Sequence, residues 1–142
     1  IFLQIKLMEI NWDVIETEYF VRSCERNNVS QEVIDSLRIW AKSVRRQITP
    51  RNSRPFISPN NIFEIWMAGI GNPDANKGKS GGYRFVYYII ILESKLFIDI
   101  IEERKNLKFK GSGGKEQKHW DNHFLELKKE LLNKYEKPSK NC

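Results

Sequence analysis

The sequence predicts an α+β fold, a small twisted antiparallel sheet with two N-terminal helices and a C-terminal helix. The sheet would consist of an N-terminal strand and a three-stranded meander. Residues 83–92 contain one charge, Arg84, within a dense run of β-branched and aromatic residues, which is typical of a strand buried on both faces. Residues 62–104 hold three apolar runs whose connections are too short for crossover helices, so we expect these strands to be antiparallel.

The first element is predicted over residues 10–17, where apolar and polar residues alternate. This period of two indicates a strand with Trp12 and Val14 on one face. A short helix is expected over residues 19–26, because Asn27-Asn28 is a helix-ending pair.

A longer helix is predicted over residues 31–47, with Ser30 as its N-cap. One face carries an apolar stripe at helical spacing, formed by Val33, Leu37, Trp40, Ala41 and Val44. The other face is basic, and it is either a solvated surface or part of a binding site.

Residues 49–61 contain three prolines and are expected to form a loop without regular structure. A strand follows over 62–67, then a long glycine-rich connection over 69–82. Connections of this length tend to be functional or disordered. The 83–92 strand and a last strand over 96–101 complete the meander.

The final helix is predicted over residues 115–134. Its apolar stripe comprises Trp120, Phe124, Leu127 and Leu131. His119 and His123 stand four residues apart on it, a spacing that suits either two metal ligands on one face or ordinary packing. No third ligand is evident, so we predict no metal site.

Length and composition favour one domain over residues 1–142, with residues 1–9 as a candidate extension and 136–142 as a polar tail. No apolar run approaches the length of a membrane span. Cys24 and Cys142 suggest no disulfide framework, which fits a reducing cytoplasm.

The net charge of +6 arises entirely from residues 104–142, since residues 1–103 are balanced. A basic surface favours a polyanion such as nucleic acid, an acidic partner protein, or simply solvated lysines.

Gly78-Lys79-Ser80 is similar to the end of a phosphate-binding P-loop. The motif would need glycine at position 73, which is Pro73. It would also need to open a helix, whereas this segment opens a strand. Nucleotide hydrolysis is therefore disfavoured.

The order of elements, together with Gly-Lys-Ser-Gly-Gly-Tyr-Arg-Phe-Val-Tyr-Tyr over 78–88, resembles the RelE/ParE toxin superfamily, nearest its HigB-like branch. The segment 14–20 is similar to the opening strand and turn of that branch. The likeness covers roughly residues 10–110, and the glycine-rich segment is its most specific part.

The resemblance implies the toxin of a type II toxin-antitoxin system: a metal-independent endoribonuclease without cofactors that cleaves mRNA, usually on the ribosome, and inhibits translation. It also implies a cytoplasmic protein whose partners are a cognate antitoxin, mRNA and the ribosome, with no membrane partner.

The resemblance and the chemistry of RNA cleavage suggest site residues. Arg84 matches the family's arginine at the start of this strand and would clamp phosphate, unless it forms an ion pair with Glu64 or Glu103. Arg104 is expected as a second phosphate cation and Lys105 as an acid or substrate contact. The basic loops offer four further candidates for RNA binding, Lys77, Lys79, Lys108 and Lys110.

Two departures from the family pattern keep an alternative open. The 62–67 strand has no basic residue and offers only Glu64, which would be the general base if it shared a face with Arg84, or else that arginine's structural partner. The last strand has no histidine. The alternative is a non-catalytic or ParE-like protein of the same fold that inhibits a protein target such as gyrase. A weaker third reading is a non-toxic RNA-binding accessory domain.

Overall fold

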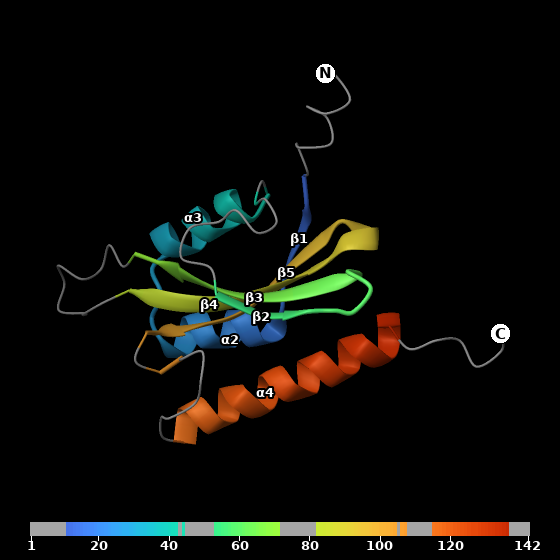
Figure 1. Ribbon diagram of the computed structural model, residues 1–142. Coiled ribbons are helices and arrows are strands. Elements are labelled where there is room, and N and C mark those ends of the chain that lie inside the picture. Colours follow the sequence, from blue (N-terminus) through green and yellow to red (C-terminus); the bar gives the residue numbers. More distant parts are fainter. Residues whose placement is uncertain are drawn as a thin grey trace, which may run out of the picture.

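The computed structural model describes residues 11–42, 44, 53–71, 82–104, 106–107 and 115–136. The described chain forms an α+β fold, in agreement with the expected class. Its five-stranded sheet has the order β1-β5-β4-β3-β2. Helix α3 lies on one side of the twisted sheet and helix α4 on the other (Figure 1).

The predicted meander is confirmed, with strands that differ from the expected ranges by a few residues. Strand β3 spans Phe63–Ile70, β4 spans Tyr83–Ile90 and β5 spans Lys95–Glu103. Both pairings, β3 with β4 and β4 with β5, are antiparallel. A short 3-10 turn, η2 at Ile91–Glu93, joins β4 to β5.

Two expectations about the sheet were wrong. The N-terminal strand β1, Asp13–Glu16, pairs with β5 in parallel, so the sheet is mixed. The segment 49–61 was expected to be irregular, but Ser53–Ile57 forms strand β2, antiparallel to β3. Proline is tolerated on an edge strand, and the β2 register shifts between Ser53 and Phe56, on either side of Pro55.

Alternation along the strands builds a core on each face of the sheet. On the α3 side, odd-numbered residues of β4, including Phe85 and Tyr87, pack with Leu37 and Ala41 of the helix. On the α4 side, Val86 and Ile90 pack with the α4 stripe that the sequence predicted. The 83–90 strand is therefore buried on both faces, as expected for the middle of a sheet.

The helices begin where the sequence indicates. Helix α2 spans Glu18–Arg26, and the side chain of Thr17 caps it by accepting from the Phe20 amide. Helix α3 spans Gln31–Lys42, and Ser30 Oγ accepts from the Val33 amide at 3.3 Å, which confirms the predicted N-cap. Helix α4 spans Lys115–Leu131 and continues as a π-helical turn, η3 at Leu132–Glu136.

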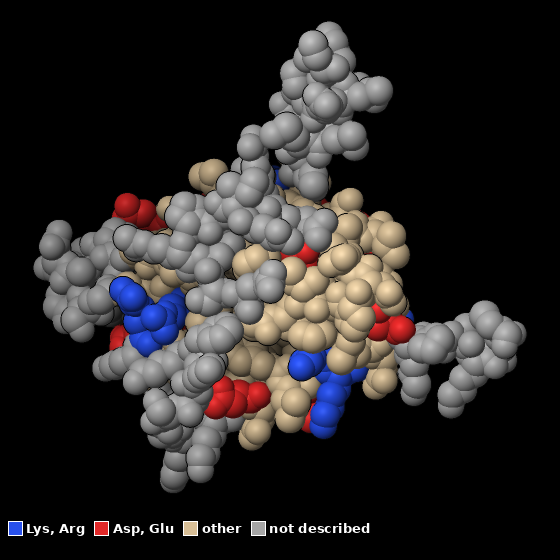
Figure 2. All heavy atoms as spheres, viewed as in Figure 1, with Lys and Arg blue, Asp and Glu red and all other residues tan. Residues whose placement is uncertain are grey.

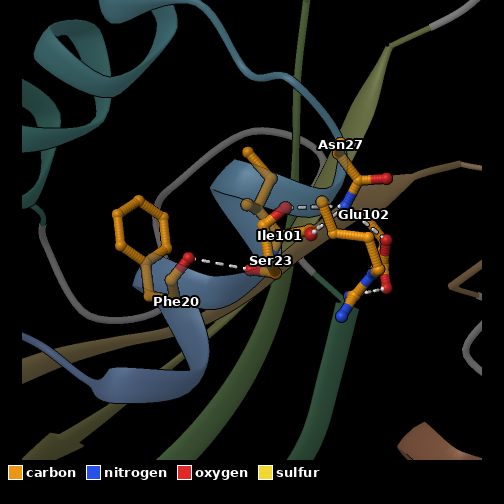
Figure 3. Close-up of polar contacts among 6 residues, drawn as sticks. Phe20, Ser23, Asn27, Ile101 and Glu102 are labelled. Atoms are coloured by element: carbon orange, nitrogen blue, oxygen red, sulfur yellow. Dashed lines mark hydrogen bonds and ion pairs between the residues drawn. The ribbon is translucent and has the colours of Figure 1, made fainter.

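Helix α2 completes the hydrogen bonding of β5. Strand β1 covers β5 only as far as Ile98, so the outer edge of residues 99–103 has no strand partner among the described residues. Ser23 Oγ accepts from the Ile101 amide at 3.0 Å, and Asn27 Nδ2 donates to the Ile101 carbonyl at 3.2 Å (Figure 3). Side chains of a helix thus replace a neighbouring strand, because buried backbone polar groups must find partners.

The edge contact predicts the effect of Ser23→Ala. Ser23 is fully buried and also donates to the Phe20 carbonyl at 2.9 Å. The substitution leaves the buried Ile101 amide without its acceptor, which should lower the free energy of unfolding by about 1–3 kcal/mol in urea denaturation. Ser36→Ala, on the exposed face of α3, is the control and should change it little. Equal effects of the two substitutions would contradict this account of the edge.

Gly82, immediately before β4, is required by a close backbone approach. A Cβ at this position would lie 2.6 Å from the Ile70 carbonyl oxygen, whereas a Cβ at Gly71 would meet nothing within 4 Å. We expect Gly82→Ala to destabilise the fold by about 1–3 kcal/mol, and Gly71→Ala to be nearly neutral. Thermal unfolding of the two variants measures the difference, and a neutral Gly82→Ala would refute the close approach.

Candidate functional site

The candidate site lies at the end of the sheet where β4 begins and β5 ends. Arg84 stands directly opposite Glu102 in the antiparallel register, and opposed residues share a face. Val86 and Ile100, the next pair on that face, belong to the α4 core. Arg84 and Glu102 therefore lie on the face that α4 covers.

Glu102 is a buried carboxylate that is paired with two side chains of the α2 segment. Its side chain is 1% exposed. It forms an ion pair with Arg26, from the last turn of α2. Asn27 Nδ2 also donates to its Oε1 at 2.5 Å (Figure 3). A buried charge is stable only when it is paired and hydrogen-bonded, and both partners come from the segment that caps the β5 edge.

Three arginines lie at this end of the sheet, and one of them, Arg26, pairs with the Glu102 carboxylate. Arg84 is partly buried, and its Nη1 donates to the Leu107 carbonyl at 3.1 Å. Arg26 is about half exposed. Arg104 is exposed; its amide donates to the Gly82 carbonyl at 3.1 Å, which continues the β4–β5 pairing by one residue.

Figure 2 shows basic atoms gathered at the left of the molecule, in the part of the view where Figure 1 places the start of β4 and the end of β5. Acidic atoms flank them. The expected phosphate cations Arg84 and Arg104 lie at the same end of the sheet. Arg26 joins them from α2, a helix that was predicted from the sequence but not assigned to the site.

Trp120 lines the site from α4. Its ring is 3% exposed, and the Arg26 guanidinium carbon lies 5.1 Å from the ring centroid, a cation–π geometry. Its indole nitrogen is buried without a hydrogen-bond partner. The predicted stripe explained Trp120 as packing, but its contact with Arg26 also ties α4 to the arginine cluster.

The structure excludes Glu64 as a base acting beside Arg84. Glu64 stands opposite Ile89 on β4, five residues from Arg84, so the two side chains lie on opposite faces of the sheet. Glu64 is fully buried, and its Oε1 accepts from the indole of Trp66 at 2.8 Å. The same geometry excludes Glu64 as the structural partner of Arg84. Glu103 stands opposite Tyr83, one residue out of phase with Arg84.

Five predicted residues lie outside the described residues: Lys77, Lys79, Lys105, Lys108 and Lys110. Their expected roles as substrate or RNA contacts stay predictions.

Sequence reasoning missed a carboxylate–histidine pair next to the arginine cluster. Asp99 of β5 is 2% exposed, and its Oδ2 lies 2.6 Å from Nε2 of His123 on α4. Thr17 Oγ1 lies 3.0 Å from Asp99 Oδ1. Asp99 is the extra residue of a β-bulge, since Val86 pairs with Ile100 while Tyr87 pairs with Ile98. The sequence signal that could have revealed this pair is Asp99 itself, a single acid inside the apolar run 96–101.

The two histidines of α4 have different surroundings. His123 is partly buried against Asp99, whereas His119 is exposed and its ring lies edge-on to Trp120 at 4.7 Å. Within the described ranges, no group of three or more His, Cys, Asp and Glu residues is arranged to hold a metal ion.

Cys24 offers a test of the packing between α2 and the sheet. Burial raises the pKa of its thiol to about 12, and the Glu16 carboxylate adds to the rise. In a Cys142→Ser background, alkylation of Cys24 at pH 8 should be about 1000-fold slower in buffer than in denaturant, because the thiolate is the reactive form. Since the unfolded thiol titrates near 9.0, this group's contribution to stability is lost as the pH rises above that value. Equal alkylation rates in buffer and denaturant would contradict the burial.

No protein-family model matches the chain, and a search of curated proteins finds no significant match. None of the described helices is long and apolar enough to cross a membrane.

Proposed function

We propose that the protein is the toxin of a type II toxin-antitoxin system, a metal-independent endoribonuclease that cleaves mRNA with the ribosome and thereby inhibits translation. Its partners are a cognate antitoxin, mRNA and the ribosome, and it acts in the cytoplasm. The proposal joins the resemblance of residues 78–88 to the RelE/ParE superfamily with the geometry of the candidate site.

The arginine cluster at one end of the sheet is the single observation that supports this function best. The three arginines come from separate parts of the chain: Arg26 pairs with Glu102, Arg84 stands opposite Glu102 in the β4–β5 register, and Arg104 follows the end of β5. One buried carboxylate orients part of the cluster and leaves an excess of positive charge. Such a cluster suits a phosphodiester backbone, since a guanidinium binds two phosphate oxygens at once.

The chemistry follows from the charge. In metal-free RNA cleavage the 2′-OH attacks the adjacent phosphorus, and negative charge grows on the phosphorane oxygens. Cations fixed before the reaction stabilise that charge, which is usually the largest contribution to catalysis. Arg84 is held by the Leu107 carbonyl at the start of a central strand, whereas the charge of Arg26 is paired with Glu102.

Arg84→Ala tests the proposal. We expect the wild type to cleave mRNA in a translating extract and the variant to lose activity by about 100-fold or more, because one fixed donor to developing negative charge is removed. Primer extension on the transcript measures cleavage. Arg38→Ala is the matched control, since Arg38 pairs with Glu16 away from the cluster and its loss should leave cleavage unchanged.

Wild-type protein that neither cleaves RNA nor arrests growth would refute the proposal.

One observation favours the alternative of a ParE-like inhibitor: β3 contributes no basic residue to the site, and its only acid, Glu64, faces the other side of the sheet. Growth arrest with intact mRNA would support that alternative.

A further inference from the structure

We propose that His123, oriented by Asp99, is the general base of the proposed RNA cleavage. The inference rests on the proposed function and supplies a proton acceptor that the arginines do not provide. Residues from α2, β5 and α4 converge on this pair.

The Asp99–His123 pair is held in place by specific contacts. Asp99 is nearly fully buried at a bulge in a central strand, and Thr17 Oγ1 and His123 Nε2 are its side-chain partners. Bulges re-aim side chains and are over-represented beside active sites. Alternation from Phe97 and Ile98 directs the Asp99 carboxylate toward α4, and the bulge places Ile100 on the same side, so that Asp99 itself has no opposite residue on β4.

The contact with Asp99 also orients the imidazole ring of His123. With Nε2 hydrogen-bonded to the carboxylate, the imidazole is held in one position and its other nitrogen, Nδ1, is left to accept a proton. A carboxylate that fixes the tautomer and direction of a histidine is a recurrent arrangement for general bases. The His123 side chain is 12% exposed, so most of it is shielded from solvent while a part stays accessible.

The Asp99–His123 pair is linked to the arginines through Trp120, which contacts both: its ring centroid is 6.0 Å from the His123 ring and 5.1 Å from the Arg26 guanidinium carbon. A single strand that crossed the junction of α2 and α4 could therefore present a ribose to His123 while Arg26 holds a phosphate.

The junction of α2 and α4 also has an aromatic side chain suited to a base. Tyr19 of α2 is about half exposed, and its ring lies edge-on to His123, with centroids 4.4 Å apart. Exposed aromatic rings are common stacking platforms for single-stranded RNA. In Figure 1, α2 and α4 are both drawn below the strands, and the contact between Tyr19 and His123 joins the two helices.

The step balances without a metal or cofactor. His123 Nδ1 takes the proton of the ribose 2′-OH while the 2′-oxygen bonds to phosphorus. The bond from phosphorus to the 5′-oxygen breaks, the leaving oxygen takes a proton from water, and the hydroxide that remains accepts the proton from His123. The products are a 2′,3′-cyclic phosphate and a 5′-hydroxyl end, and Asp99 acts as a positioning residue throughout.

The experiment is the pH profile of RNA cleavage by wild type and His123→Gln. Glutamine keeps a hydrogen bond to Asp99 but transfers no proton. We expect kcat to fall about 100-fold with little change in KM, and the acidic limb of the profile to disappear. The groups facing His123 are Asp99 from β5, Tyr19 from α2 and, one turn away on α4, His119. His119→Gln is therefore the control and should retain the limb.

Two further measurements separate chemistry from folding. Exogenous imidazole should restore activity to His123→Ala, which a purely structural role would not allow. In the wild type, the imidazole nitrogen resonances of His123 should shift when a 2′-deoxy-substituted oligonucleotide, which is not cleaved, binds. An active His123→Gln with an unchanged profile overturns this inference alone. Wild-type protein without any RNA cleavage overturns the proposed function and the inference together.

Discussion

The unpaired half of the β5 edge is the constraint on which the rest of the structure depends. Strand β1 ends at Glu16, so the backbone of residues 99–103 needs other partners. Thr17, Ser23 and Asn27 supply them. Because these three side chains belong to α2 and its cap, the helix is held at one height along the strand. That position sets Tyr19 against His123 and Arg26 beside Glu102.

The arrangement of the candidate site therefore follows from the way α2 hydrogen-bonds the unpaired edge of β5. A longer β1 would satisfy the same backbone groups, and α2 would then be held by the packing of side chains such as Phe20 and Cys24 without these hydrogen bonds. With α2 in place, the helix brings a charged residue to a carboxylate that the sheet alone would have left buried and unpaired. Structural and functional roles overlap in Asn27, which donates both to the Ile101 carbonyl and to Glu102.

The elements with strong local patterns were predictable from the sequence. The β4 strand, the Ser30 cap and the α4 stripe follow from β-branched density, a capping residue and helical spacing. The parallel pairing of β1 and the β2 strand were missed because both depend on long-range pairing, and Pro55 argued locally against a strand. At the site, Arg84 was placed correctly at the start of its strand, whereas the faces of Glu64 and Asp99 depend on register and on a bulge that no local pattern encodes.

The bulge at Asp99 has a consequence for how related sequences are compared. Residues 95–98 and 100–103 of β5 alternate between the two faces of the sheet, but the two halves are out of phase by one position. Deletion of Asp99 would restore regular alternation, because Ile98 belongs to the α3 core and Ile100 to the α4 core, and the residues that follow would keep their faces. A strand that ran through Asp99 without the bulge would instead exchange the faces of every residue that follows, bringing Ile101 to the α4 side and Glu102 to the α3 side. Related sequences without the bulge should therefore be one residue shorter here, and an alignment gap placed elsewhere in the strand would misassign half of the site.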